Sequence, residues 1–564
     1  MKRTPITVIA GMICLALGVS VMHGKSATQN HTAEQLGQVN FPTSCSAEAQ
    51  PLMETGVALL HSFQYQQADQ TFSQAADRDP KCAMAYWGQA MTNYEQLWEF
   101  PHRRAIKRGA EDTERAQTLG ASTDRERGYI AAAAAFYLAD AKLTEKQRLQ
   151  AYSTSLAKLH QQSPDDVNAA AFYALSLVAL AEQQEVDPQA NRQAAIAILE
   201  PLCRKAPNNP GPAHYMIHAT DTAELAPQGL TAARTYSKIA PDSSHALHMP
   251  SHIFVRLGLW QESITSNIAA SDSAAKATQE HRAEPHYQFH ALDFLNYSYL
   301  QSGQESKARA MIKELAEVPG ADQRSIAEHQ SWFAARNAFE LHSWKEAAQL
   351  PIPEVPPDSQ ESTYRVRAIG AARSGDPQAA RQNFDKFMEI AAEEQRRSAH
   401  HRDHAPEKSV QQLEVEAWLA FADGKKDQAV TALRSAADRE DADGVDSLTM
   451  PAREMLGDLL LELQRPAEAI AEYKSALKNS PNRFDALSGA AHAAQLAGDV
   501  AAANAYYAKL TQISGPAADR AELMEAKSFL NRAVKANEPV VCRHLHPLFP
   551  FCCDRYRPDA SRHR

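Results

Sequence analysis

Histidines and aspartates gather in one stretch of this chain at spacings that could place their side chains together. The group consists of His214, His218, Asp221, His245, His248, His252, His290 and Asp293. His214 and His218 are four residues apart, the spacing at which two histidines on one helix bind the same metal ion. Imidazole nitrogens suit zinc, copper and nickel, and carboxylates can complete such a site or orient its histidines. The pattern indicates a candidate site for a divalent transition metal, with His214, His218, Asp221, His248, His252 and His290 as its ligands.

Two other interpretations of the same group stay open. The imidazoles, together with Arg336, could hold an anionic or polar ligand. They could also hydrogen-bond to one another and to the backbone, and so stabilise a tightly packed fold. The sequence carries no GxSxG, HExxH or P-loop motif, and no GxGxxG in a βαβ context. Histidine and aspartate permit acid–base or metal-assisted hydrolysis, but their spacing does not require it, so we predict binding rather than catalysis.

The composition indicates the kind of element that must position these residues. Glycine is scarce, with 22 residues in 564, and stretches rich in alanine, glutamine, glutamate and leucine recur, which favours an all-α chain. The net charge of −10 is mild for this length, and no strong basic stripe appears. Nucleic acid is therefore not expected as the main partner.

Residues 450–483 follow the 34-residue tetratricopeptide (TPR) pattern. Small residues at Gly457 and Ala469 let two antiparallel helices approach closely, Tyr473 fills the remaining space, and Pro481 ends the second helix. The same register recurs, with varying clarity, from residues 49, 83, 167, 210, 244, 289, 328, 360, 410 and 484. We predict a right-handed superhelical solenoid of about 11 antiparallel helical hairpins.

In such a superhelix the first helix of each hairpin faces the concave side. The register was set by prolines and small residues, yet it places the histidine group on one concave stripe across consecutive repeats. The predicted groove residues are His214, His218, Asp221, His245, His248, His252, His290, Asp293, Tyr297 and Arg336. Pro250 lies inside one expected helix and should start or kink it, which would displace His245 and His248 from the groove.

The N-terminus reads as an export signal over residues 1–27. Lys2 and Arg3 precede the apolar run from Ile6 to Met22, which is short for a membrane span. We expect a periplasmic or secreted protein, with an uncleaved N-terminal anchor as the alternative and the only expected link to a membrane. Export favours a disulfide between Cys45 and Cys82, which precede the first and second repeats; two separate thiols are the other interpretation.

Four further segments follow from these patterns. Residues 28–348 form an N-terminal TPR-like solenoid with the histidine-rich groove, and 349–359 (LPIPEVPPDSQ) form a proline-rich break. Residues 360–535 form the C-terminal TPR repeats. Residues 536–564 contain three cysteines but no helical periodicity, so a disordered tail is expected.

The chain resembles a family of exported bacterial TPR proteins. The resemblance spans roughly residues 40–340 and rests on GVALLHSFQYQQADQTF, DPKCAMAYWGQAM, AAAFYALSLVAL, GPAHYMIHATD, GLTAARTYSKIAP and HALHMPSHIFVRLGLWQESI. It implies export and a TPR solenoid, and it assigns no catalytic residues. The cysteine-containing tail departs from the family pattern.

These observations predict an exported TPR scaffold that binds a protein segment or a small ligand in its concave histidine-rich groove. The alternative is a metal-binding protein, or a metal-dependent hydrolase, that uses the histidine and aspartate cluster.

Overall fold

A computed structural model describes residues 35–97, 100–182, 188–398 and 408–537 of the chain. Within these ranges every regular element is a helix, and two of the helices are short 3-10 turns. The predicted export signal at 1–27 lies outside the described residues, as does nearly all of the tail at 536–564. None of the helices in the described ranges is both long enough and apolar enough to cross a membrane.

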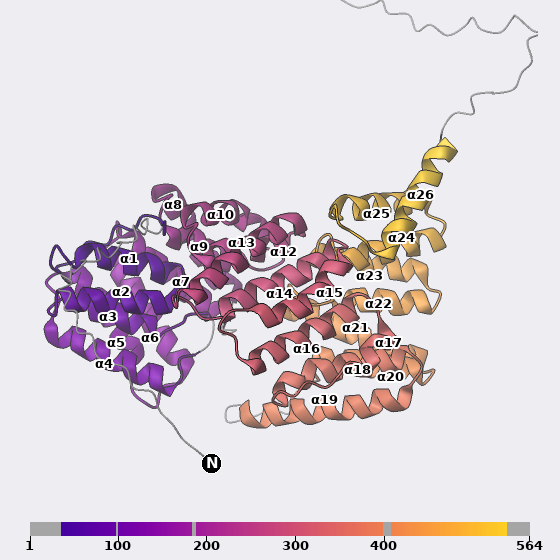
Figure 1. Ribbon diagram of the computed structural model, residues 1–564, viewed down its shortest axis with the longest axis horizontal. Helices are drawn as coiled ribbons and strands as arrows, with labels where there is room; N and C mark the ends of the chain where they lie inside the picture. The colour runs from indigo at the N-terminus through magenta and orange to yellow at the C-terminus, as the bar shows by residue number, and fades with distance from the viewer. Residues whose placement is uncertain (1–34, 98–99, 183–187, 399–407, 538–564) are drawn as a thin grey trace, which may run out of the picture. The chain divides into compact units, whose positions relative to one another are not determined.

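The helices pair in chain order as antiparallel hairpins (Figure 1). In the N-terminal half the pairs are α1 (Gln50–His61) with α2 (Tyr65–Arg78), α3 (Ala83–Thr92) with α4 (Arg103–Leu119), α5 (Asp124–Tyr137) with α6 (Glu145–Gln162), α7 (Val167–Glu182) with α8 (Pro188–Lys205), α9 (Pro210–Thr220) with α10 (Ala226–Ile239), and α11 (Ser244–His248) plus α12 (Pro250–Arg256) with α13 (Trp260–Gln279).

The second half continues in the same way. Its pairs are α14 (His286–Gln301) with α15 (Glu305–Glu314), α16 (Gln323–Glu340) with α17 (Trp344–Ala348), α18 (Glu361–Arg373) with α19 (Pro377–Ser398), α20 (Val410–Ala422) with α21 (Lys426–Asp443), α22 (Ala452–Glu462) with α23 (Pro466–Asn479), and α24 (Phe484–Leu496) with α25 (Val500–Ile513). The 3-10 turns η1 (Leu315–Glu317) and η2 (Asp358–Gln360) lie between pairs, and α26 (Ala521–Asn537) ends the series.

The predicted all-α fold of TPR-like hairpins is confirmed. Each expected repeat begins within a few residues of the first helix of a hairpin, from α1 to α24. The described residues contain twelve hairpins rather than about 11, because the irregular region after α4 holds the additional pair α5 and α6.

Glycines allow the hairpins to stack closely. Phe72 on α2 lies between Gly56 on α1 and Gly88 on α3, and a Cβ atom at either glycine would come within 2.4–2.5 Å of the Phe72 ring. The same arrangement recurs among the C-terminal repeats at Gly457, Gly489 and Tyr473. The aromatic ring fills the space that the two glycines leave open, so one motif joins three successive helices.

A disulfide joins Cys45 and Cys82, whose Cα atoms are 4.8 Å apart. Cys45 precedes α1, and Cys82 is the N-cap of α3, where its sulfur accepts a hydrogen bond from the backbone N–H of Ala85. The bond therefore ties the segment that leads into the first hairpin to the start of the second hairpin.

The proline-rich segment 349–359 connects α17 to η2 without helical structure over most of its length. Val355 is buried, and the side-chain amide of Gln360 donates hydrogen bonds to the carbonyl oxygens of Pro353 and Val355. All described residues fall in one compact unit that begins at Gln35, so this segment lies within that unit.

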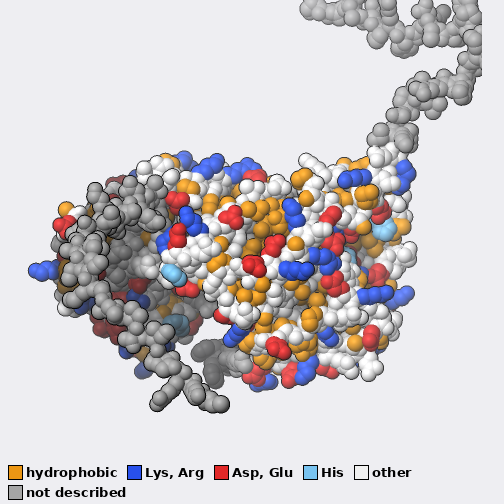
Figure 2. Space-filling view, in the orientation of Figure 1, with side chains coloured by type: hydrophobic (Ala, Val, Ile, Leu, Met, Phe, Trp, Pro, Cys, Tyr) orange, Lys and Arg blue, Asp and Glu red, His pale blue; other side chains and the backbone are white. Residues whose placement is uncertain are grey.

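Late repeats contact the hairpins that carry the histidines. The indole N–H of Trp260, at the start of α13, donates to the carbonyl oxygen of Asn482 at 2.8 Å. Arg483 is fully buried and forms ion pairs at 2.7 Å with Glu340 of α16 and Glu454 of α22. On the face drawn in Figure 2, acidic and basic side chains are interspersed over these helices.

Candidate metal centre

The six groove histidines form two clusters of three. The first triad consists of His214, His218 and His245, and the second triad of His248, His252 and His290. In each triad one ring nitrogen per residue lies within 4.8 Å of the corresponding nitrogens of the other two. The sequence predicted one site, and the structure divides its histidines into two.

Helix α9 supplies two members of the first triad. His214 and His218 are four residues apart on it and therefore share one face. Pro210 occupies the first turn of α9, where its missing N–H leaves no hydrogen bond unmade. The third member, His245, comes from the next hairpin.

The proline in the next hairpin divides one helix into two. Helix α11 carries His245 and His248, ends before Met249, and is followed by α12, which begins at Pro250 and carries His252. The expected interruption at Pro250 is present, but the expected displacement is not, because His245 and His248 each belong to a triad. One chain segment thus supplies the first triad with one ligand and the second triad with two.

The first triad converges on the Nε2 atom of His214. This atom lies 3.0 Å from Nε2 of His218 and 3.1 Å from Nε2 of His245. On the other side of the ring, Nδ1 of His214 is 2.6 Å from the backbone carbonyl oxygen of His61. A carbonyl oxygen only accepts, so Nδ1 carries the proton and the Nε2 lone pair of His214 faces the other two rings.

The second triad places two lone pairs opposite each other. Nε2 of His248 and Nε2 of His252 are 3.1 Å apart. Nδ1 of His248 lies 2.7 Å from Oδ1 of Asn267, and Nδ1 of His252 lies 2.8 Å from a carboxylate oxygen of Asp221. The amide nitrogen of Asn267 donates to the carbonyl oxygen of Ser263, which leaves Oδ1 to face His248. Both Nδ1 atoms are therefore donors, and in the neutral form of each ring the Nε2 atom carries a lone pair.

The third ring of the second triad comes from α14. The ring centroid of His290 lies 4.4 Å from that of His248 and 5.8 Å from that of His252. Its neighbour Phe294, one turn further along α14, packs edge-on against His248 at 4.8 Å. Three consecutive hairpins thus contribute to the two triads.

These separations suit a shared metal ion. Two nitrogens bound at 2.0–2.1 Å to one tetrahedral ion are about 3.3–3.4 Å apart. The observed separations of 3.0–3.1 Å differ from this by a few tenths of an ångström. In the second triad the facing lone pairs of neutral His248 and His252 repel, and a cation between them replaces this repulsion with two bonds.

Burial keeps the imidazoles in the form that binds metals. It lowers the pKa of His214 to about 3. It also lowers the pKa of His218, His245 and His248 well below the ordinary value, and the neighbouring histidines add to the effect. These rings are neutral at neutral pH, so a metal ion does not have to displace protons from them.

Asp221 lies outside both triads, although the sequence predicted it as a ligand. Its carboxylate accepts hydrogen bonds from Nδ1 of His252 at 2.8 Å and from Nε of Arg256 at 2.9 Å. Burial opposes its ionisation, but Arg256 and His252 outweigh burial and hold its pKa well below the usual range. Asp221 thus orients His252, a role that the sequence also allowed.

Three other predicted groove residues engage in contacts within the protein. Arg336 forms an ion pair of 2.6 Å with Asp293, and both side chains are nearly buried. The guanidinium of Arg336 also lies over the ring of Trp332. Tyr297 is buried and accepts a hydrogen bond from Arg483. These groups stabilise the packing of α14 against its neighbours and are not among the triad ligands.

Two residues that fix the ring protons were not predicted. His61 ends α1 and acts on His214 through its backbone carbonyl, which no residue type signals. Asn267 lies on α13, the second helix of its hairpin, and is fully buried. A buried asparagine between apolar residues is a weak signal by itself, because it shows no partner.

Each triad combines buried members with members that reach the surface. His214, His245 and His248 are buried, His218 and His252 are half-buried, and His290 is exposed. Each triad therefore has at least one member that reaches the surface, while its other members are enclosed by protein.

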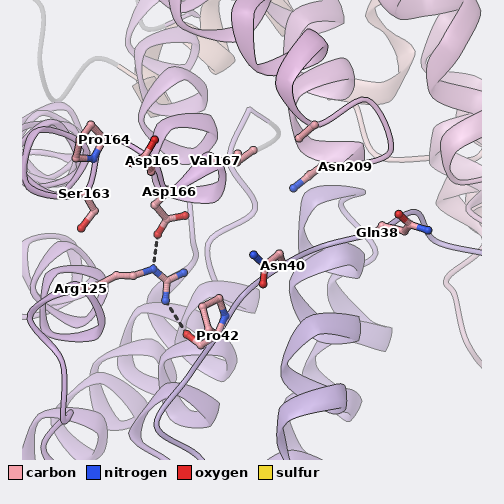
Figure 3. Close-up of a pocket in the computed structure, with 11 residues that line it drawn as sticks. Gln38, Asn40, Pro42, Arg125, Ser163, Pro164, Asp165, Asp166, Val167 and Asn209 are labelled. Atoms are coloured by element: carbon pink, nitrogen blue, oxygen red, sulfur yellow. Dashed lines mark hydrogen bonds and ion pairs between the residues drawn. The ribbon is translucent and has the colours of Figure 1, made fainter.

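A separate cavity of about 400 Å³ lies between α5, α7 and the segment before α1 (Figure 3). Arg125 points into it and donates to the carboxylate of Asp166 at 2.5 Å and to the carbonyl oxygen of Pro42 at 2.8 Å. Because these contacts occupy Arg125 and Asp166, the pair serves to join neighbouring segments.

Comparisons with known proteins agree with the helical hairpins. A family model for the tetratricopeptide repeat matches residues 415–483 and 454–519, which span α21 to α25 and part of α20. No curated protein matches the chain.

Several solved structures are similar to the chain. A tetratricopeptide repeat protein from Parabacteroides merdae has 15% identity, with 52% of this chain and 98% of that one covered and a TM-score of 0.30. A human IFIT1 dimer with m7Gppp-AAAA has 12% identity, coverage of 81% and 94%, and a TM-score of 0.33. An IFIT1 monomeric mutant with Gppp-AAAA has 14% identity, coverage of 81% and 95%, and a TM-score of 0.35.

Proposed function

We propose that this protein is a TPR scaffold that binds transition-metal ions, one in each histidine triad. The observation that carries the proposal is the opposed pair in the second triad. Two Nε2 lone pairs face each other at 3.1 Å while both Nδ1 protons are held by Asn267 and Asp221. A cation between the two rings is the simplest partner for that arrangement.

The ligand set narrows the class of metal. All six ligands are imidazoles, and sulfur and carboxylate donors are absent from both triads. Imidazole sets of this kind suit zinc, copper, nickel and cobalt, whereas calcium and magnesium prefer oxygen donors. Three protein ligands per ion also leave a coordination position open, as in metal sites that bind a further molecule.

We further propose that the protein acts outside the cytoplasm. The apolar segment that follows Lys2 and Arg3 supports export, and a Cys45–Cys82 disulfide is typical of an oxidising compartment. A metal-binding protein in the cell envelope would meet metal ions before they enter the cell. Fractionation of the producing cells tests this part, since export predicts the mature chain in the periplasm or the medium.

The metal assignment is tested by elemental analysis of purified protein. The full chain is incubated in turn with Zn²⁺, Cu²⁺, Ni²⁺ and Co²⁺ and then dialysed. We expect two ions per chain for at least one metal. His214→Ala with His218→Ala should leave one ion, and His492→Ala, which changes an exposed histidine outside both triads, should leave two.

Loss of metal from the double variant must be separated from loss of structure. Circular dichroism and the melting temperature of the apo variant serve for this purpose. Wild-type protein that keeps no metal, and whose melting temperature none of the four metals raises, would refute the proposal, because an ion at 100 times its dissociation constant stabilises by about 2.7 kcal/mol.

A second candidate function is the binding of a protein segment in the same groove. The observation that favours it is Trp332 of α16, which is 45% exposed and whose ring is covered on one side by Arg336. Exposed aromatic residues beside arginine are typical anchors for partners. Peptides enriched by display against the full chain should lose binding with Trp332→Ala, and should keep it with Met524→Ala, a second exposed apolar residue.

A further inference from the structure

We propose that the two triads, once loaded, form one dinuclear centre that binds a small anion from the groove, of the hydroxide, azide or oxyanion class. This inference rests on the proposed metal binding. The proposed function concerns only the binding of metal ions, whereas this inference adds that the bound ions take up an anion from solution.

The first argument is the charge of the site. Six neutral imidazoles would hold two dications without offsetting their charge. The two nearest carboxylates are already paired, Asp221 with Arg256 at 2.9 Å and Asp293 with Arg336 at 2.6 Å. A loaded centre therefore carries a large positive charge in a partly buried setting, and an anion is the ligand that reduces it.

The second argument is the position of the open side. His214, His245 and His248 enclose the centre from within the protein, whereas His218, His252 and His290 reach the surface. Three ligands leave each ion one position free. Because each triad has a member that reaches the surface, a small molecule can reach that position from outside.

The third argument is the closeness of the two triads. The ring centroids of His218 and His252 are 6.3 Å apart, and those of His245 and His248 are also 6.3 Å apart. Two pairs of rings are therefore neighbours across the boundary between the triads. Asp221 adds a further link, because it follows α9 of the first triad and accepts from His252 of the second. An anion between the ions would contact both.

The experiment uses Co²⁺-loaded full-length protein, whose visible absorption reports coordination number. Sodium azide and inorganic phosphate are titrated separately into protein that holds two ions per chain. We expect saturable changes in the cobalt bands with one anion bound per pair of ions. The spectrum at saturation should show more than four ligands, as for an anion that joins a water in the fourth position.

A variant with one intact triad separates a dinuclear centre from two independent ions. His290→Ala removes an exposed ligand of the second triad and should leave the fold intact, as circular dichroism would verify. We expect one strongly bound ion and at least a tenfold weaker azide affinity. His492→Ala should bind both ions and azide as the wild type does.

Three results would overturn the inference. The first is two bound ions with cobalt bands that neither anion changes. The second is two azide ions per chain bound independently. The third is unchanged azide affinity in His290→Ala. None of these three results contradicts the proposed metal binding. A chain that retains no cobalt before any anion is added would contradict it.

Discussion

At the scale of single residues, the position of the imidazole protons determines what the groove can bind. Nδ1 of His214, His248 and His252 each faces an oxygen atom, so in the neutral rings the lone pair lies on Nε2. Three different oxygens do this: a backbone carbonyl, an amide oxygen and a carboxylate. Without them the proton of a neutral imidazole can lie on either nitrogen, and Nε2 would not be fixed as the atom that binds the metal.

Asp221→Ala should weaken the second triad selectively. The substitution removes the acceptor that fixes His252 and leaves Arg256 without its carboxylate. Loss of such an orienting partner weakens metal binding by about 10–100-fold. Isothermal titration with Zn²⁺ should show this loss for one of two ions, while Asp272→Ala, at an exposed aspartate, should change neither ion. An equal loss of affinity for both zinc ions would contradict the assignment of Asp221 to the second triad.

The residues of this site could be predicted from the sequence where residue type and helical register determine their position. Both place the six histidines on one face, and the pair His214 and His218 follows from spacing alone. The division into two triads depends on the break before Pro250, whose geometry the sequence did not give. The same predicted stripe contained Asp293, Tyr297 and Arg336. These residues instead contact partners within the protein that are distant in sequence, so they stabilise the packing of the helices.

At the scale of elements, close helix packing depends on paired glycines around an aromatic ring. Gly88→Ala should destabilise the protein by about 1–3 kcal/mol, because the new Cβ would overlap the Phe72 ring. Phe72→Leu provides the matched test, since a smaller side chain leaves room for that methyl group. Urea denaturation should show that the double variant loses less stability than the sum of the two single variants. Strict additivity would mean that the two residues do not compete for space.

A buried carboxyl of α21, which caps the start of α22, should make stability depend on pH. Glu440 accepts a hydrogen bond from the backbone N–H of Ala452, and burial, aided by Glu414, raises its pKa from 4.5 to about 7. A raised folded-state pKa means that the stability from this group is complete below about pH 4.5. It is lost as the pH rises through 7.

Glu440→Gln keeps an oxygen acceptor without the ionisation. The variant should therefore be more stable than the wild type at pH 8, by about 1–3 kcal/mol, and the gain should shrink towards pH 4.5. Melting temperatures across this range measure the effect. Glu317→Gln, at an exposed glutamate, is the control, and a gain in stability that stays constant with pH would argue against titration of Glu440.

The helices themselves were largely predictable, because small residues recur at fixed positions of the repeat. The region after α4 was the exception. Gly109 of α4 packs against Tyr137 of the following α5, and Gly128 of α5 packs against Leu159 of α6, at places that the 34-residue pattern does not mark. Here too a glycine packs against a large side chain, but the spacing between the two differs from that of the 34-residue repeat. A search for the repeat pattern therefore does not find this hairpin.

At the scale of the whole described chain, one buried arginine joins repeats that are far apart in sequence. Arg483 precedes α24, yet it contacts Glu340 of α16, Glu454 of α22 and Tyr297 of α14. A repeat pattern predicts contacts between hairpins that are adjacent in the chain, so this contact between distant hairpins could not be predicted from it. The two carboxyls share one guanidinium. Burial raises the pKa of Glu454, and Arg483 opposes that rise.

Arg483→Met tests whether this junction stabilises the repeats together. The variant leaves two buried acidic side chains without a cation, and such a loss costs about 3–5 kcal/mol. Adding Glu340→Gln and Glu454→Gln removes both charges, so the triple variant should recover a large part of that loss, as guanidinium denaturation would measure. If the triple variant is no more stable than Arg483→Met, the cost lies in lost packing rather than in unpaired charge.

The same junction is linked to the second triad through Arg256, which donates to the carbonyl oxygen of Val445, shortly before α22. Arg483→Met should therefore reduce zinc affinity at the second triad more than at the first.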